Sequence, residues 1–269
     1  GLPDDVASLE RAKVLADSLL AIEPSPHPGS TVGLAALTGR AHEAARRARK
    51  HPTEAIPGPS GLAPDLTALL VFAAFGGPAD SLDRLTGTVD RRIASIGSPG
   101  ERDDLRAWLG LPTSLAFATH PLPGRERSAG DWLVAAQLAA ETGESAAARD
   151  SLLSRGTVAN DNYPFNRTLD ALFAEASLWS AIGEPGAVVE WLDPTLNVLP
   201  QIPGQISQVE RTTSLVRIAA LRAEAAAELG HHADAARWAR AVTILWSDAD
   251  PFLAPRVERM RRLAACESC

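Results

Sequence analysis

The stretch AIGEPGAVVEWL (residues 181–192) decides the fold, because its pattern returns four more times along the chain. Aligned on a glycine, the other copies are LTGRAHEAARRA (37–48), AFGGPADSLDRL (74–85), ETGESAAARDSL (141–152) and ELGHHADAARWA (228–239). A threonine or an apolar residue stands just before the glycine in each copy. We predict that each glycine ends a helix in the left-handed conformation, which a residue without Cβ adopts at little cost.

The positions after the glycine predict a second helix packed closely on the first. Five residues after it stands a short side chain, and nine residues after it stands alanine or leucine; these residues are Ala44, Ser81, Ala148, Val188 and Ala235, then Ala48, Leu85, Leu152, Leu192 and Ala239. Small side chains allow two helices to approach, and a short turn makes the pair antiparallel. Pro78 and Pro185 stand at early helix positions, where a missing N–H has no cost.

The spacing of the turns predicts a row of such helix pairs. Successive glycines are 37, 34, 33, 40 and 47 residues apart when Gly110, in the weaker copy AWLGLPTSLAFA, is counted between Gly76 and Gly143. The middle values equal the period of common helix–turn–helix repeats, and the longer ones require insertions. We expect one all-α domain over residues 1–265, a right-handed α-solenoid of twelve to fourteen helices, followed by a tail at 266–269.

Composition and charge narrow the class of protein. The chain has 269 residues, is rich in Ala, Leu and Arg, and has a formal net charge of −7, which argues against a nucleic-acid partner. The most apolar run, LTALLVFAAF (66–75), is too short to cross a bilayer, so no membrane insertion is expected. Because the chain begins at Gly1 rather than Met, we expect a processed product or a piece of a longer protein.

The residues offer no recognisable catalytic or metal chemistry. The histidines form no metal-ligand or nucleophile pattern, so we expect no enzyme activity, no metal and no cofactor. Cys266 and Cys269 form a C-x-x-C at the end of the chain, either as a frayed tail or as a local disulfide. A disulfide would imply an oxidising compartment, and an extracytoplasmic location is therefore favoured.

The glycine-centred motif resembles the tetratricopeptide repeat. Ala136, Ala176 and Ala223, seven residues before the glycine, match the small residue of that family, and Trp132 matches the large residue near the start of the first helix. Val32 and Leu69 depart from the pattern in the first two copies. The resemblance implies a concave groove lined by the first helix of each pair; its positions, carried over from the glycine register, are Gln137, Asp170, Phe173, Ser177, Arg217 and Glu224.

A second resemblance concerns the C-terminal stretch. LWSDADPFLAPRV (245–257) is similar to the terminal repeat of helical regions attached to bacterial serine/threonine protein kinases. The resemblance implies the sensing or scaffolding part of a larger bacterial signalling protein, which binds a protein or peptide. Asp250-Pro251 then opens a last helix with Val257, Met260 and Leu263 on its inner face.

Two insertions and three functions stay open at this point. TVANDNYPFNR (157–167), with Tyr163 and Phe165, and DPTLNVLPQIPGQ (193–205) are either binding loops or inert connectors. The chain is a binding module, a structural protein that assembles with its own copies, or an enzyme on an α/α toroid, which the scarcity of Tyr and Phe disfavours. We expect Arg217→Glu combined with Phe173→Ala to abolish partner binding without unfolding the protein.

Overall fold

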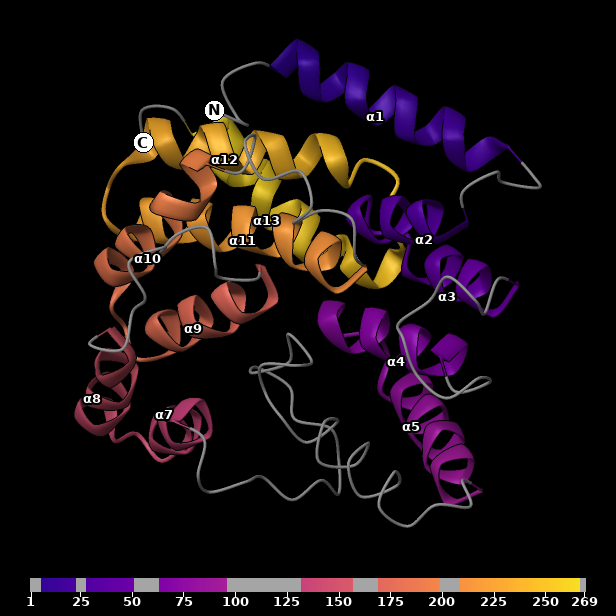
Figure 1. Cartoon of the computed structure of the whole chain (residues 1–269). Coiled ribbons are helices and arrows are strands. Elements are labelled where there is room, and N and C mark those ends of the chain that lie inside the picture. The colour runs from indigo at the N-terminus through magenta and orange to yellow at the C-terminus, as the bar shows by residue number, and fades with distance from the viewer. Residues whose placement is uncertain are drawn as a thin grey trace.

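The computed structural model describes residues 6–22, 28–50, 63–95, 132–156, 169–198 and 209–266, and all regular elements in these ranges are helical (Figure 1). The all-α prediction is confirmed at this level. In chain order the elements are α1 (Val6–Ala21), α2 (Pro28–Leu37), α3 (Ala41–Lys50), α4 (Ala63–Phe75), α5 (Ala79–Ala94), α7 (Trp132–Glu141), α8 (Ser145–Gly156), α9 (Leu169–Ala181), α10 (Pro185–Val198), α11 (Val209–Glu228), α12 (His232–Leu245), the 3₁₀ turn η3 (Pro251–Leu253) and α13 (Ala254–Ala265).

The five glycines of the repeated pattern have the predicted left-handed backbone, with φ between 66° and 79°. At Gly183 the N–H donates to the Ser180 carbonyl and the Glu184 N–H donates to the Trp179 carbonyl, both at 3.0 Å. This pair of bonds satisfies the last carbonyls of α9, and the same pattern recurs at the other four glycines. The Glu184 carbonyl accepts from the Val188 N–H at 3.2 Å, so one residue ends α9 and starts α10. Gly110 lies outside the described residues.

The register predicted for the second helix of each pair agrees with burial. The residues five and nine positions after each glycine are buried, except Ser81, which is half-buried. Short side chains therefore stand where the two helices of a pair meet, as the sequence predicts.

The helices pack in consecutive pairs, and the last pair also meets the first. α2 packs on α3, α4 on α5, α7 on α8, α9 on α10 and α11 on α12. The central helix α11 contacts α9 and α10, and on another side α2 and α4 (Figure 1). In a row where repeats touch only their neighbours, pairs at opposite ends would not meet. The right-handed superhelix itself stays a prediction.

The buried core includes three of the described tryptophans. Trp179, Trp238 and Trp246 are buried. The Trp246 ring lies edge-on to Phe75 with 5.9 Å between ring centroids, which joins the end of α12 to the end of α4. Burying a side chain of this size stabilises the fold by roughly 1.5–3 kcal/mol. The side chains of Trp108 and Trp132 lie outside the described residues.

Two expectations about the C-terminal half have different outcomes. The insertion predicted to begin at residue 193 is wrong at its start, because α10 continues to Val198 with Pro194 inside it. Leu192, Thr195 and Leu196 form one buried face at helical spacing, and this face continues the helix through the proline. The predicted last helix is confirmed, since Val257 and Met260 of α13 are buried.

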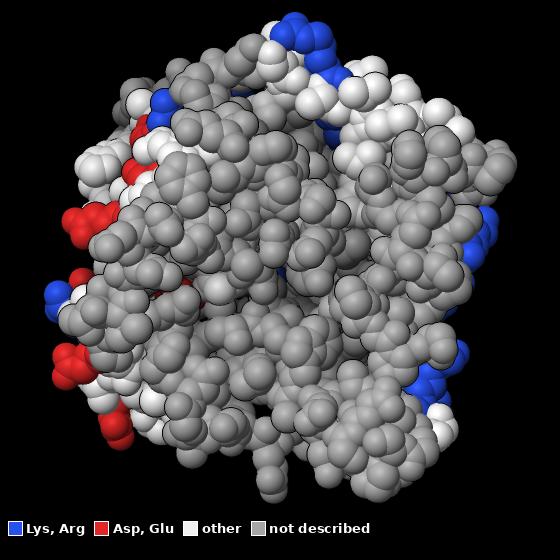
Figure 2. Space-filling model, viewed as in Figure 1, with Lys and Arg blue, Asp and Glu red and all other residues white. Residues whose placement is uncertain are grey.

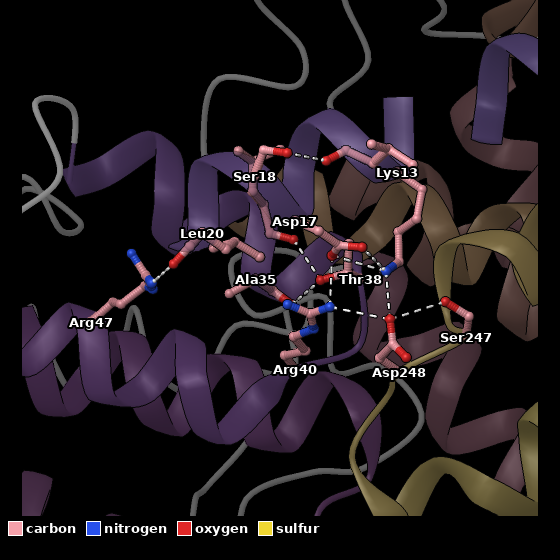
Figure 3. A network of polar contacts seen from close by, with 12 residues as sticks. Lys13, Asp17, Ser18, Leu20, Ala35, Thr38, Arg40, Arg47, Ser247 and Asp248 are labelled. Atoms are coloured by element: carbon pink, nitrogen blue, oxygen red, sulfur yellow. Dashed lines mark hydrogen bonds and ion pairs between the residues drawn. The ribbon is translucent and has the colours of Figure 1, made fainter. Parts of the chain in front are cut away.

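A polar network fastens α1 to the rest of the molecule (Figure 3). The buried Lys13 Nζ donates to Asp17 Oδ2 and to Asp248 Oδ2, both at 2.7 Å. Arg40, in the turn between α2 and α3, donates to Asp17 Oδ1 at 2.6 Å and to Asp248 Oδ2 at 3.2 Å. Two carboxylates from distant parts of the chain thus compensate the charges of one lysine and one arginine.

No helix in the described ranges combines the length and the apolar character that a bilayer crossing requires.

Candidate binding cleft

A cleft of about 610 Å³ lies where α9, α11 and α13 meet. The helices contribute residues one turn apart, because side chains three, four or seven positions apart share a helix face. The lining includes Phe173 and Ser177 from α9, Arg217 and Glu224 from α11, and Arg256 and Arg259 from α13. The buried side chains of Trp246 and Met260 complete its apolar part.

Phe173 and Arg217 form a buried contact at this cleft. The Arg217 guanidinium lies over the Phe173 ring, with Cζ 3.6 Å from the ring centroid, and both side chains are buried. A stacked pair of this kind contributes on the order of 2 kcal/mol when desolvated. Burial, and secondarily the charge of Arg256, holds the pKa of Arg217 well below its usual range. The stack fixes the side of the cleft between α9 and α11.

Ser177 stabilises the cleft from within α9 rather than by presenting a donor to it. Its hydroxyl donates to the Phe173 carbonyl oxygen at 2.7 Å, one turn earlier in the same helix. This hydrogen bond uses the only hydrogen of the hydroxyl, so a ligand would find only an acceptor there.

Glu224 is the single acidic residue of a lining that holds four arginines, Arg217, Arg256, Arg259 and Arg262. Arg259 Nε lies 2.8 Å from Glu224 Oε1. Burial raises the pKa of Glu224, the charges of Arg259 and Arg256 oppose this rise, and Glu228 adds to it. The cleft therefore has an excess of positive charge within a chain whose formal net charge is −7.

The structure brings four of the six predicted groove residues together, namely Phe173, Ser177, Arg217 and Glu224. Gln137 does not line this cleft; it is buried in α7, with Nε2 donating to Glu141 Oε1 at 3.2 Å, and its groove role stays a prediction. Among the helices of the described residues α7 packs mainly on α8 and α9, which leaves Gln137 in another helix pair. The side chain of Asp170 and both loop residues, Tyr163 and Phe165, lie outside the described residues.

Because Phe173 and Arg217 are buried, substitutions of these two residues are expected to destabilise the fold. Arg217→Glu would place a carboxylate beside a ring in a buried position, and Phe173→Ala would leave a cavity. The expectation that this double variant keeps the fold is therefore replaced by one of unfolding.

Sequence reasoning missed the contribution of α13 to the cleft. The basic run RVERMRR (256–262) is visible in the sequence, yet no local pattern places it across α9 and α11. Arg256 and Arg259 enter the cleft because Val257 and Met260 on the neighbouring face are buried.

On the face drawn in Figure 2, the acidic side chains of the described residues lie at the left edge, on the side of α8 and α10, with a few basic ones among them. Other basic side chains lie at the top and at the right edge, on the side of α3 to α5. Within the described residues no group of three or more His, Cys, Asp or Glu has the arrangement of a metal site.

Comparison with known proteins adds no relative: no family model, curated protein or solved structure matches the chain.

Proposed function

We propose that this chain is a non-catalytic module that binds a peptide or protein segment in the cleft between α9, α11 and α13. The observation that carries the proposal is that four groove positions, carried over from the tetratricopeptide resemblance through the glycine register, line one cleft. We further propose that the helix pairs follow a right-handed superhelix, as in tetratricopeptide repeats, and that the chain senses or scaffolds within a larger bacterial signalling protein.

The lining suits a short peptide segment. The cleft volume of about 610 Å³ lies within the range of sites that enclose small ligands or a few side chains. Ala181 and Pro255 offer an exposed apolar surface, while Arg256 and Arg259 offer charged donors at the edge. A segment with one apolar side chain beside one polar or acidic group would satisfy both.

The test replaces exposed cleft residues and leaves the buried stack intact. Peptides that bind are first selected from a random library, and their affinity is then measured by fluorescence anisotropy. We expect Arg256→Ala combined with Arg259→Ala to weaken binding roughly tenfold or more, because each arginine loses a charge-assisted contact. The matched control is Arg237→Ala with Arg261→Ala, two exposed arginines of α12 and α13 that do not line the cleft.

The control should change the affinity by less than about twofold, since contacts outside a site contribute little. Equal weakening by both double variants, or selected peptides that crosslink to other helices, would contradict the assignment of this cleft.

Self-association is a second candidate function, favoured by the outer face of α1. Val14, Leu15 and Ile22 are large apolar residues with 64%, 61% and 49% of their surface exposed. Apolar groups exposed together at helical spacing favour contact with another surface. Light scattering over a range of protein concentrations distinguishes an assembling protein from a monomeric binding module. An α/α-toroid enzyme is the third and least favoured alternative.

We also propose an extracytoplasmic location. Cys266 is disulfide-bonded, and disulfides persist mainly in oxidising compartments. The other cysteine, Cys269, lies outside the described residues.

A further inference from the structure

A second pocket, of about 320 Å³, lies between α3, α4 and α5, away from the cleft described above. Its walls carry nitrogen and hydroxyl groups, from His42, Arg49, Ser81, Arg84 and Thr88. Its floor is apolar and buried, formed by Ala45, Phe72 and Leu85. No carboxylate is among these lining residues, although the chain as a whole is acidic.

His42 is held in a fixed orientation at this pocket. Its Nδ1 lies 2.9 Å from Asp250 Oδ2, and its backbone N–H donates to the same oxygen at 2.8 Å. The Phe72 ring packs edge-on against the imidazole with 4.9 Å between centroids, and the Phe252 ring lies at 6.0 Å. Because Asp250 occupies Nδ1, Nε2 is the nitrogen left for a ligand.

Arg84 and Ser81 add hydrogen-bond donors to the pocket, and no carboxylate of the described residues pairs with them. Arg84 Nε donates to the Asp80 carbonyl at 3.1 Å, and its Nη2 donates to the Ser81 hydroxyl oxygen at 3.3 Å. Within the described ranges Arg84 has no carboxylate within ion-pair distance, and the Ser81 hydroxyl hydrogen has no acceptor. Both groups can therefore donate to an anion without losing an existing ion pair.

Arg49 brings a second guanidinium to the pocket, and its ion pair is a loose one. Its Nε lies 3.6 Å from Asp65 Oδ1, whereas Arg92 Nε lies 2.6 Å from the other oxygen of the same carboxylate. Arg92 is the closer cation to Asp65, so the contact of Arg49 with this carboxylate is the weaker of the two and Arg49 can turn toward the pocket at small cost.

We propose that this pocket binds the phosphoryl group of a phosphate monoester. His42, Arg49 and Arg84 surround the pocket from two helices, and Ser81 supplies a hydroxyl donor. A dianion with three terminal oxygens accepts from all of them at once, and arginine binds phosphate with two parallel N–H bonds. A neutral ligand would leave the cationic groups uncompensated, which disfavours it.

The experiment titrates the full chain with inorganic phosphate, with phosphoserine and with a short phosphoserine peptide at constant ionic strength. Binding is followed by calorimetry and by amide chemical shifts of α3 and α5. We expect saturable binding of the phosphoryl group, weakened roughly tenfold or more by Arg84→Gln. Arg84→Lys should recover part of the affinity, because it restores the charge without the planar group.

Arg237→Gln, on the exposed surface of α12, is the control with the same change in net charge, and it should leave the affinity unchanged.

Tighter binding of the peptide than of free phosphate would identify a phosphorylated protein as the source of the phosphoryl group. Equal affinities would identify a small phosphorylated metabolite as the source. Ser81→Ala, at a half-buried position, gives a second variant with a smaller loss if Arg84→Gln alters the circular dichroism spectrum. Absence of saturable binding, or equal weakening by Arg237→Gln, would overturn the proposal.

Discussion

At the scale of single residues, the five turn glycines are not equivalent. All have positive φ, but a Cβ added at Gly39 would lie 2.7 Å from Ala249 Cβ and 3.0 Å from Trp246 Cδ1. A Cβ at Gly230 would meet nothing within 4 Å. Position 39 thus requires a glycine for two reasons: the backbone there is left-handed, and Ala249 and Trp246 of the C-terminal segment leave no space for a Cβ.

Gly39→Ala should therefore destabilise the protein more than Gly230→Ala. The left-handed conformation costs both variants about 1–2 kcal/mol. Overpacking against Ala249 and Trp246 adds roughly 1–3 kcal/mol at Gly39 alone. Urea unfolding followed by circular dichroism measures the two free energies. Equal losses would mean that the C-terminal segment moves aside without cost.

Much of the local structure could be predicted from the sequence, because its causes are local. The glycine at the end of a helix and the small residue five positions later belong to one short segment, as at Gly183 and Val188. The partners of His42 and Arg217 could not be predicted in this way. Asp250 and Phe173 reach them only through the tertiary fold, and the chain between them carries no mark of the contact.

At the scale of elements, α1 depends on charge as well as on apolar packing. Leu9, Ala16 and Leu20 are buried, but so is Lys13, which reaches Asp17 and Asp248. The pKa of Asp248 is lowered, first by the hydrogen bond from Lys13 and against the effect of burial. A carboxyl group with a lowered folded-state pKa contributes stability at neutral pH and loses it as pH falls through that pKa.

Asp248→Asn should therefore destabilise the protein near pH 7 and have little effect in acid. The expected loss is about 1 kcal/mol at neutral pH, since Asp248 is largely exposed; it should shrink once the pH falls below the ordinary aspartate pKa of about 4 and vanish below the lowered folded-state pKa. Urea unfolding at a series of pH values measures the difference between variant and native protein. Asp83→Asn, at an exposed residue of α5, is the control. A loss that is the same at every pH would exclude the charge of Asp248 as its cause.

Some acid sensitivity should persist in Asp248→Asn. The pKa of Glu43 is also lowered, chiefly by the hydrogen bond from Arg46. Arg47, which also pairs with Glu43, connects α3 to α1 by donating to the Leu20 carbonyl. None of these links could be predicted from the pattern of α1, because the residues that compensate Lys13 from outside the helix are far away in the sequence. Lys13 is buried because Asp248, in the segment that follows α12, accepts from its Nζ together with Asp17 of α1.

At the scale of the whole molecule, the first and last helix pairs stabilise each other. Gly33 of α2 lies so close to α11 that an added Cβ would be 3.2 Å from Thr212 Oγ1. α1 packs on α12 in addition. Repeats that touch only their neighbours lose structure from the ends inward, whereas joined ends favour one cooperative transition.

Val32→Ala should accordingly raise hydrogen exchange in α11 and α12 as well as in α2. Val32 is buried in α2, and its truncation costs roughly 1–3 kcal/mol. Exchange measured by mass spectrometry on peptides of α11 and α12 provides the test, with peptides of α8 as the distant comparison. Faster exchange confined to α2 and α3 would show that the ends unfold independently.

The contact between α2 and α11 also has a consequence for synthesis on the ribosome. α2 is translated long before α11, which carries its partner surface. Until then the buried face of α2, including Val32 and Ala36, stays exposed to solvent or to a chaperone. The nascent chain can form its glycine turns in order, yet it completes its core only when the last helix pair has been released.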